Sequence, residues 1–313
     1  MHLTFDWSTT LRRVRGRTSF VPDAVASSAG TRCGWKRFPF GDRIYRYGGD
    51  ALATNWARLH AGDAEPYPDV AALGRLVHAN PALGARVPDL AAAARDVEEA
   101  WRAYHAGDFA EAVDRGEAAG PVGTVVAARA AIVYATHLEE DEMRRAAILR
   151  DTVDACSVLV ELAPSWAGAW FVNGLAIGRY CQHVPLVRSL ARGMGGKSRE
   201  SLQRALQLEP ALADAHAGLG IYCTEVIDKV GAMVAALTYG VKKETAIEHF
   251  DAARVLNPRS PTTLVEYARA LMLAGGAANL GRAHALYAEA AACQPLDAQA
   301  RLDVEWARTE LAA

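Results

Sequence analysis

Histidine, acidic and hydroxyl side chains could do chemistry in this chain, but their spacing favours neither a catalytic nor a metal site. The nine histidines are dispersed, and no two are spaced as metal ligands on one helical face would be. The acidic run Glu139–Glu142 indicates the start of a helix, where carboxylates favour the positive dipole end. No G-x-S-x-G motif is present. We therefore expect a chain that is not an enzyme and that needs no cofactor and no metal.

The run Gly195–Ser198 resembles the end of a phosphate-binding loop. That loop needs a glycine five positions before its last glycine, after a β-strand. Ala191 stands there instead, and nothing upstream has the pattern of a strand. The simpler interpretation is a glycine turn that leads into a helix, with Ser198 in its first turn.

Composition narrows the class of protein further. The five cysteines are odd in number and form no C-x-x-C pair, so we expect buried thiols in a reducing compartment. The net charge of −2 favours no nucleic-acid partner, although residues 1–50 hold nine basic and four acidic residues. The longest apolar stretch, Val230–Val241, is too short to span a bilayer. We expect a cytoplasmic protein, with an organellar or periplasmic location as the alternative, and the sequence leaves homo-oligomerisation open.

Four similar phrases end in proline and reveal an internal repeat. The prolines are Pro164, Pro210, Pro258 and Pro295, and each follows a run with helical periodicity. Before the last three lie small–large–small triplets at i, i+4 and i+7, which share one face of a helix. The triplets are Ser198, Leu202 and Ala205; Ala246, Phe250 and Ala253; and Ala283, Tyr287 and Ala290.

This pattern is similar to the tetratricopeptide repeat (TPR), a pair of helices in 34 residues. Gly174, Gly220 and Ala268 occupy the small position of the first helices, where the paired helix must approach closely. The prolines are separated by 46, 48 and 37 residues, so two repeats carry long insertions between their helices. These insertions are residues 181–197 and 226–243, and we expect them to pack on each other.

The pattern predicts an all-α fold, a right-handed TPR-like α-solenoid of about five to six helical hairpins. We expect an irregular basic arm at 1–43, a helical pair at 44–88, and a solenoid at 89–313 that ends in a capping helix.

The stretch from Gly178 to Pro258 resembles a particular TPR-like group, which contains the T-component of TRAP transporters and the regulator of microtubule dynamics proteins. The resemblance rests on the phrases Gly178–Gln182, Gly196–Leu202, Ala213–His216, Gly220–Tyr222, Glu225–Lys229 and Lys243–Phe250. It implies a non-catalytic solenoid. T-components are periplasmic lipoproteins that associate with a substrate-binding partner, and some eukaryotic relatives bind lipid. No apolar run precedes Cys33 as it would in a lipoprotein.

Two binding hypotheses follow from the helix register and the insertions. The first is a scaffold or adaptor that holds a protein or peptide partner in its concave groove. The second is a module that encloses an amphipathic small molecule or lipid between the insertions, including a role beside a TRAP transporter. The charged groove residues could instead only pair with one another. The candidate binding residues are Phe171, Leu175, Arg179, Lys197, Ile221, Glu225, Lys229 and Arg269.

Overall fold

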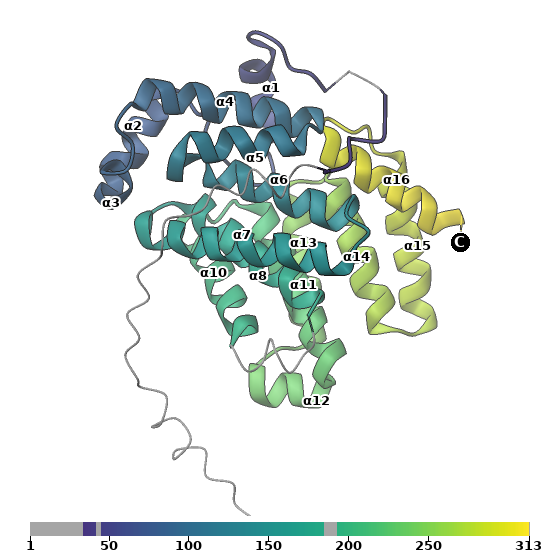
Figure 1. Ribbon diagram of the computed structural model, residues 1–313. Helices are drawn as coiled ribbons and strands as arrows, with labels where there is room; N and C mark the ends of the chain where they lie inside the picture. Colours follow the sequence, from purple (N-terminus) through teal and green to yellow (C-terminus); the bar gives the residue numbers. More distant parts are fainter. Residues whose placement is uncertain (1–33, 42–44, 185–192, 313) are drawn as a thin grey trace, which may run out of the picture. The chain divides into compact units, whose positions relative to one another are not determined.

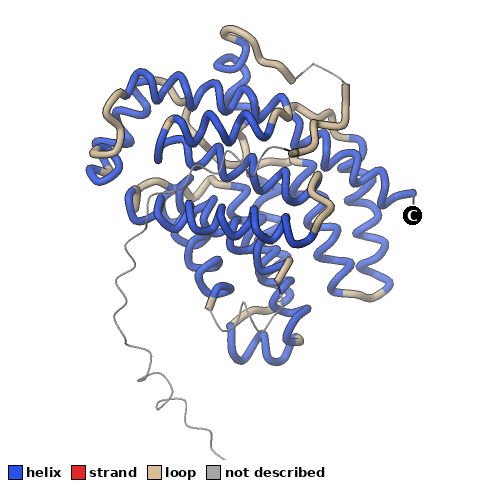
Figure 2. The backbone as a smooth tube through the Cα atoms, in the orientation of Figure 1, coloured by secondary structure: helices blue, strands red, loops and turns tan. Residues whose placement is uncertain are grey.

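The computed structural model describes residues 34–41, 45–184 and 193–312, and the regular structure in these ranges is helical (Figure 1, Figure 2). The predicted basic arm, residues 1–43, lies mostly outside the described residues, and the architecture below is that of the described part of residues 35–313. The longer elements are α1 (Ala51–Leu59), α2 (Val70–Ala79), α4 (Leu90–Ala106), α5 (Phe109–Ala118), α6 (Thr124–His137), α7 (Glu142–Leu162), α8 (Ala167–Gln182), α10 (Met194–Leu208), α11 (Ala213–Val230), α13 (Lys243–Leu256), α14 (Pro261–Ala274), α15 (Ala277–Ala292) and α16 (Ala298–Ala312). The shorter ones are α3 (Pro81–Gly84), η2 (Gly120–Gly123), α12 (Ala232–Val234) and the π-helical turn η3 (Ala235–Tyr239).

Local sequence sets where these helices begin. The side chains of Asp89, Asp141 and Ser260 accept hydrogen bonds from backbone N–H groups in the first turns of α4, α7 and α14. The four prolines of the repeat, Pro164, Pro210, Pro258 and Pro295, lie in the turns before α8, α11, α14 and α16, in that order. The predicted repeat boundaries are therefore confirmed as helix boundaries.

The helices alternate between an inner and an outer row. Inner helices α4, α6, α8, α11 and α14 are each followed by an outer helix, α5, α7, α10, α13 and α15, which packs against its own inner helix and the next one. This is the helical-hairpin stacking of a TPR-like α-solenoid, and it confirms the predicted fold class. The N-terminal helices are arranged differently: close backbone contacts join α2 to α3 and α4, and Trp56 of α1 packs edge-on against Trp101 of α4. The boundaries at residues 43 and 88 stay predictions.

The small–large–small triplets are buried, as predicted. Each triplet side chain is at most 5% exposed. Leu202 of α10 packs on Gly174 of α8, and Phe250 of α13 packs on Gly220 of α11. A methyl group at either glycine would lie 2.7 Å from the facing side chain, which is closer than van der Waals contact allows. The small residues therefore set how closely each inner helix approaches its outer partner.

The inner helices form a closed ring. Each of α4, α6, α8, α11, α14 and α16 contacts the next, and α16 also contacts α4 (Figure 1). Polar contacts join the two ends: Tyr104 donates a hydrogen bond to Gln299, and His105 Nδ1 lies 3.0 Å from Asp297 Oδ2. The capping helix was expected only to end the solenoid. It also closes the concave face, because these side chains of α4 reach its first turn.

Candidate functional site

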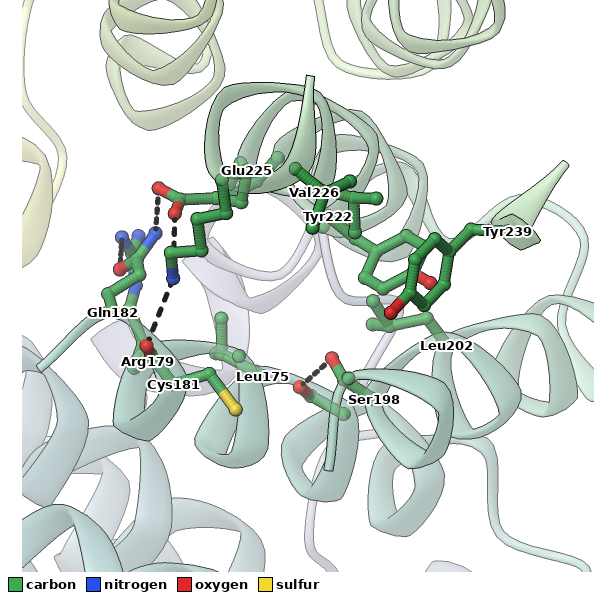
Figure 3. Close-up of a pocket in the computed structure, with 17 residues that line it drawn as sticks. Leu175, Arg179, Cys181, Gln182, Ser198, Leu202, Tyr222, Glu225, Val226 and Tyr239 are labelled. Carbon is green, nitrogen blue, oxygen red and sulfur yellow. Dashed lines mark hydrogen bonds and ion pairs between the residues drawn. The ribbon is translucent and has the colours of Figure 1, made fainter. Parts of the chain in front are cut away.

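An apolar pocket lies between α8, α10 and α11, beneath the second insertion. It is a partly open cavity of about 100 Å³. The side chains around it are shown in Figure 3. The lining residues are Gly174, Leu175, Gly178, Arg179, Cys181, Gln182, Gly195, Ser198, Leu202, Gly218, Ile221, Tyr222, Glu225, Val226, Lys229, Val230 and Tyr239.

Missing side chains create this space. Among the four lining glycines, Gly178 of α8 and Gly195 of α10 border free space, whereas Leu202 fills the space beside Gly174 of α8 and Gly218 of α11. At Gly178 an added methyl group would meet only Ser198 Oγ, at an ordinary 3.4 Å. Gly178 is therefore not needed for close packing, and its lack of a side chain leaves room in the pocket.

Charged and amide groups line one edge of the pocket. Lys229 Nζ donates a hydrogen bond of 3.1 Å to the Cys181 carbonyl and forms an ion pair of 3.2 Å with Glu225. The side chain of Gln182 donates to Glu225 at 3.1 Å and accepts from Arg179 at 3.2 Å (Figure 3). These bonds join the end of α8 to the end of α11. The predicted packing of the two insertions on each other stays a prediction, because residues 185–192 of the first insertion lie outside the described residues.

The opposite edge of the pocket is aromatic. Tyr222 of α11 and Tyr239 of η3 lie there beside Leu202 (Figure 3). Arg199 of α10 donates a hydrogen bond of 2.8 Å to the Tyr239 carbonyl, which ties the second insertion to α10. A polar edge and an apolar interior together match an amphipathic ligand.

Five of the eight predicted binding residues line this pocket: Leu175, Arg179, Ile221, Glu225 and Lys229. The other three lie elsewhere. Phe171 is buried, with the Arg129 guanidinium 5.5 Å from its ring centroid. Arg269 lies over the ring of Trp306 on α16, and Lys197 is exposed on the first turn of α10.

The inside of the ring holds a small lumen of about 60 Å³, lined by both polar and apolar side chains. Arg179 and Glu266 form a buried ion pair there, and Glu266 also pairs with Arg269 at 3.3 Å. Burial alone would raise the pKa of Glu266, but the nearby charge of Arg179 lowers it. The groove charges are therefore largely satisfied within the chain, as in the alternative that the sequence left open. The partner of Arg179 and Arg269, however, is Glu266 of α14 rather than Glu225.

A wider polar cavity of about 710 Å³ lies where α11, α14 and α16 begin. At its base, Arg129 binds Asp63 at 3.1 Å and Asp214 at 3.4 Å. Because its charged base is paired internally and much of its wall is polar, water fills it readily. In the apolar pocket, in contrast, displacement of water by an apolar part of a ligand is favourable, because it lowers the free energy of binding.

Several pocket residues were missed from the sequence. Tyr222, Val226 and Val230 follow one another at i, i+4 and i+8 on α11, so they share a face of the helix. Helical spacing could have found them once α11 was extended through the insertion. Tyr239 has no such signal, because it reaches the pocket from an irregular turn.

The run Gly195–Ser198, which resembles the end of a phosphate-binding loop, lies within helix α10. Helix α10 begins at Met194, before the glycine pair, and the Ser198 hydroxyl donates a hydrogen bond of 2.8 Å to the Gly174 carbonyl. Ser198 is thus a core residue one turn further into the helix than predicted.

Among the described cysteines, Cys156 and Cys223 are buried, and Cys181 and Cys293 are half-buried. Burial raises the pKa of Cys156 to about 12 and of Cys223 to about 11, so both stay neutral thiols.

Within the described ranges, no group of three His, Cys, Asp or Glu side chains is arranged to hold a metal ion. The helices in these ranges are also too short or too polar to cross a membrane.

No protein-family model matches this chain, and no curated protein is similar to it. Among solved structures, a thermophilic TPR protein from Thermus thermophilus is similar, with 19% sequence identity and a TM-score of 0.49. The match covers 70% of this chain and 100% of that one.

Proposed function

We propose that this chain is a non-enzymatic binding protein for an amphipathic small molecule. The apolar end of the ligand lies in the pocket between α8, α10 and α11, and its polar group lies beside Gln182, Glu225 and Lys229. The observation that carries the proposal is the apolar cavity itself, left open by glycines and bordered at one edge by charge.

The size of the cavity limits what fits. An engineered apolar cavity of about 150 Å³ in another protein accepts benzene, and this cavity is about 100 Å³. It therefore takes the end of an alkyl chain or a single ring, while the rest of the ligand extends through the opening. This corresponds to the second of the two sequence hypotheses.

The first hypothesis, a peptide in the concave groove, has less support. Helix α16 contacts α4 and closes the inner face, and Arg179 and Arg269 are engaged by Glu266. A role beside a TRAP transporter stays a hypothesis.

The pocket is tested with a dansyl-labelled undecanoic acid, a fluorescent amphipathic probe. We expect saturable binding to the purified protein. Gly178→Leu fills the cavity without displacing backbone, so it should weaken binding about tenfold or more, the equivalent of two buried methylene groups.

The matched control is Gly281→Leu, at a helical glycine with nothing within 4 Å of an added methyl group. It should bind the probe like the wild type. Absence of saturable binding to the wild type, or equal affinity in both variants, would overturn the proposal.

A further inference from the structure

The sequence His-Ala-Gly-Asp occurs twice, at residues 60–63 and 105–108, and the fold brings its two histidines together. His60 Nε2 lies 3.2 Å from His105 Nε2, and the two residues are only 4% and 1% exposed. The indole of Trp56 stacks on His60, with 3.9 Å between the ring centroids. Because the imidazoles are buried in this way, water cannot readily replace their hydrogen bonds.

The outer nitrogen of each imidazole faces a carboxylate. His60 Nδ1 lies 2.8 Å from Asp63 Oδ1, in the turn after α1. His105 Nδ1 of α4 lies 3.0 Å from Asp297 Oδ2, directly before α16. The second histidine thus takes its acid from the other end of the ring of inner helices. We call Asp63, His60, His105 and Asp297 the tetrad.

The hydrogen bonds of the tetrad determine how many protons it holds. A carboxylate only accepts, so the nitrogen that faces each aspartate must carry a hydrogen, and a bond between the two Nε2 atoms needs one more. These three hydrogens are one more than two neutral imidazoles carry. With two, either two lone pairs face each other or a bare nitrogen faces a carboxylate. With four, two N–H groups face each other. The count stays the same if an aspartate takes one of the protons.

Charged and titratable groups surround the tetrad on several elements. Arg129 of α6 binds Asp63 at 3.1 Å and Asp214 of α11 at 3.4 Å. The backbone N–H of Glu65 donates to Asp63, and the rings of Tyr47 and Tyr104 lie edge-on to His105. The wide polar cavity is lined by the two aspartates of the tetrad and also by Arg58, Arg259 and Glu289.

These surroundings favour a tetrad with a single extra proton. Burial alone would raise the pKa of Asp63, but the charges of His60 and Arg129 lower it, so this acid stays ionised. Burial lowers the pKa of His105, although its hydrogen bond to Asp297 opposes the shift. A second extra proton, on His105, is therefore taken up only in acid.

We propose that the tetrad is a pH-sensitive closure of the ring. A proton shared between His60 and His105 holds α4 against α16 at neutral pH, and a further proton on His105 loosens this contact in acid. Loosening exposes His105 to water, where an imidazole accepts that proton near pH 6.5. Protons reach the tetrad through the wide polar cavity, because Asp63 and Asp297 line it.

The sign of the pH dependence follows from His105. Because its pKa is lowered in the folded chain, its contribution to stability is complete above pH 6.5 and is lost as pH falls below that value. The loss acts where α4 meets α16, so acid should open the inner face that α16 closes.

Nitrogen-15 NMR of the full chain labelled at histidine counts the protons. At pH 7.5 we expect both Nδ1 atoms of the tetrad to carry a hydrogen and the two Nε2 atoms to share one. The signals that change in Asp297→Asn identify the pair. Two Nε2 atoms without a proton at this pH would overturn the proposal.

Asp297→Asn also changes the expected count. The asparagine amide N–H can donate to His105 Nδ1, and His105 Nε2–H can then donate to His60, so two hydrogens satisfy every contact. The variant should therefore hold one proton fewer at pH 7.5. It should keep α4 as protected from hydrogen exchange as in the wild type.

Hydrogen exchange measures the loosening in acid. After correction for the intrinsic exchange rate, protection of α4 and α16 in the wild type should fall between pH 7.5 and pH 5 relative to α13 and α15. The charge of Asp297 favours protonation of His105, so the fall should occur about one pH unit lower in Asp297→Asn.

Glu65→Gln is the matched control, an acid two residues from Asp63 but outside the tetrad. Burial raises the pKa of Glu65 to about 8, so glutamine changes little charge below that pH. The control should match the wild type in proton count and in the pH at which α4 loses protection. The proposal fails if acid leaves the relative protection of α4 unchanged, if Asp297→Asn holds as many protons as the wild type, or if Glu65→Gln shifts the loss of protection as far as Asp297→Asn does.

Discussion

Single glycines in the inner helices have two different roles. Gly174 and Gly220 are contact points, because Leu202 and Phe250 occupy the space where a side chain would be. Gly178 borders open space, so its lack of a side chain serves the cavity. The same residue type on neighbouring helices thus supports packing at one position and a binding site at another.

Gly220→Ala should destabilise the fold. Its methyl group would lie 2.7 Å from the Phe250 ring, and overpacking of this kind costs about 1–3 kcal/mol, partly offset by better helix propensity. Urea unfolding at neutral pH measures the change. Gly281→Ala, where the space is empty, should instead stabilise by about 0.5–1 kcal/mol. Equal stability changes in both variants would show that the Phe250 contact is not tight.

At the scale of elements, α16 meets α6 and α14 through a buried pair of titratable groups. His137 Nε2 of α6 lies 3.4 Å from Asp303 Oδ1 of α16, and Thr262 of α14 donates to Asp303 Oδ2 at 2.5 Å. Burial raises the pKa of Asp303 to about 7 and lowers the pKa of His137 to about 4. Between these values both groups are neutral in the folded chain, so the contact is a neutral pair and not an ion pair.

Asp303→Asn should change how stability depends on pH. The Asp303 carboxyl holds its proton more tightly in the folded state, so its contribution to stability falls as pH rises from 3.8 to about 7. Asparagine removes that loss and still accepts the Thr262 hydrogen bond. As pH rises from 5 to 8, the free energy of unfolding of the variant should therefore increase by on the order of 2–3 kcal/mol relative to that of the wild type.

The unfolding free energies of both proteins at pH 5 and pH 8 check this prediction. His137 has the opposite slope, since its pKa is lowered and its stabilising contribution is lost as pH falls from 6.5 toward 4. That slope is present in both proteins and cancels in the comparison. A constant difference between them at the two pH values would contradict the neutral pair.

The repeat elements were predictable, but the site was only partly so. The triplets, such as the one around Phe250, and the prolines are local patterns that recur. The triplets indicate which face of a helix is buried, and the prolines indicate where a helix ends. Register on the first helices assigned Leu175 and Ile221 to the inner face, and both border the pocket and the lumen of the ring. Tyr239 and the Arg179–Glu266 pair were not predictable, because one depends on an irregular turn and the other on how six helices close into a ring.

At the scale of the molecule, the contact between α16 and α4 joins residues almost 200 positions apart in sequence. His105 and Asp297 are separated by 192 residues, and Tyr104 and Gln299 by 195. In an open solenoid each repeat contacts only its neighbours, and its stability is a sum of local terms. Here a destabilising change in α16 should also lower the local stability of α4, the first helix of the ring.

Asp297→Ala tests this coupling. It removes the acceptor of His105 and the side-chain cap of α16, at a cost of roughly 2–4 kcal/mol. Hydrogen exchange should show faster exchange in α4 as well as in α16. Glu289→Ala is the control, since its exposed pair with Arg254 joins only the outer helices α15 and α13 and should cost about 0–1 kcal/mol. Unchanged protection of α4 in Asp297→Ala would mean that the ring contact carries no energy.

Ring closure also affects the elasticity of the repeat array. A row of helical hairpins whose ends are free can stretch and twist like a spring, because small rotations between neighbours add up along it. Joining α16 to α4 makes those rotations cancel around a circuit, so the array loses its softest motion. Movement is then confined to parts outside the circuit. Helix α12 with the turn η3 is such a part, and Tyr239 of η3 lines the pocket. Because the ring of inner helices is stiff, the second insertion is the element that should move when a ligand enters the pocket.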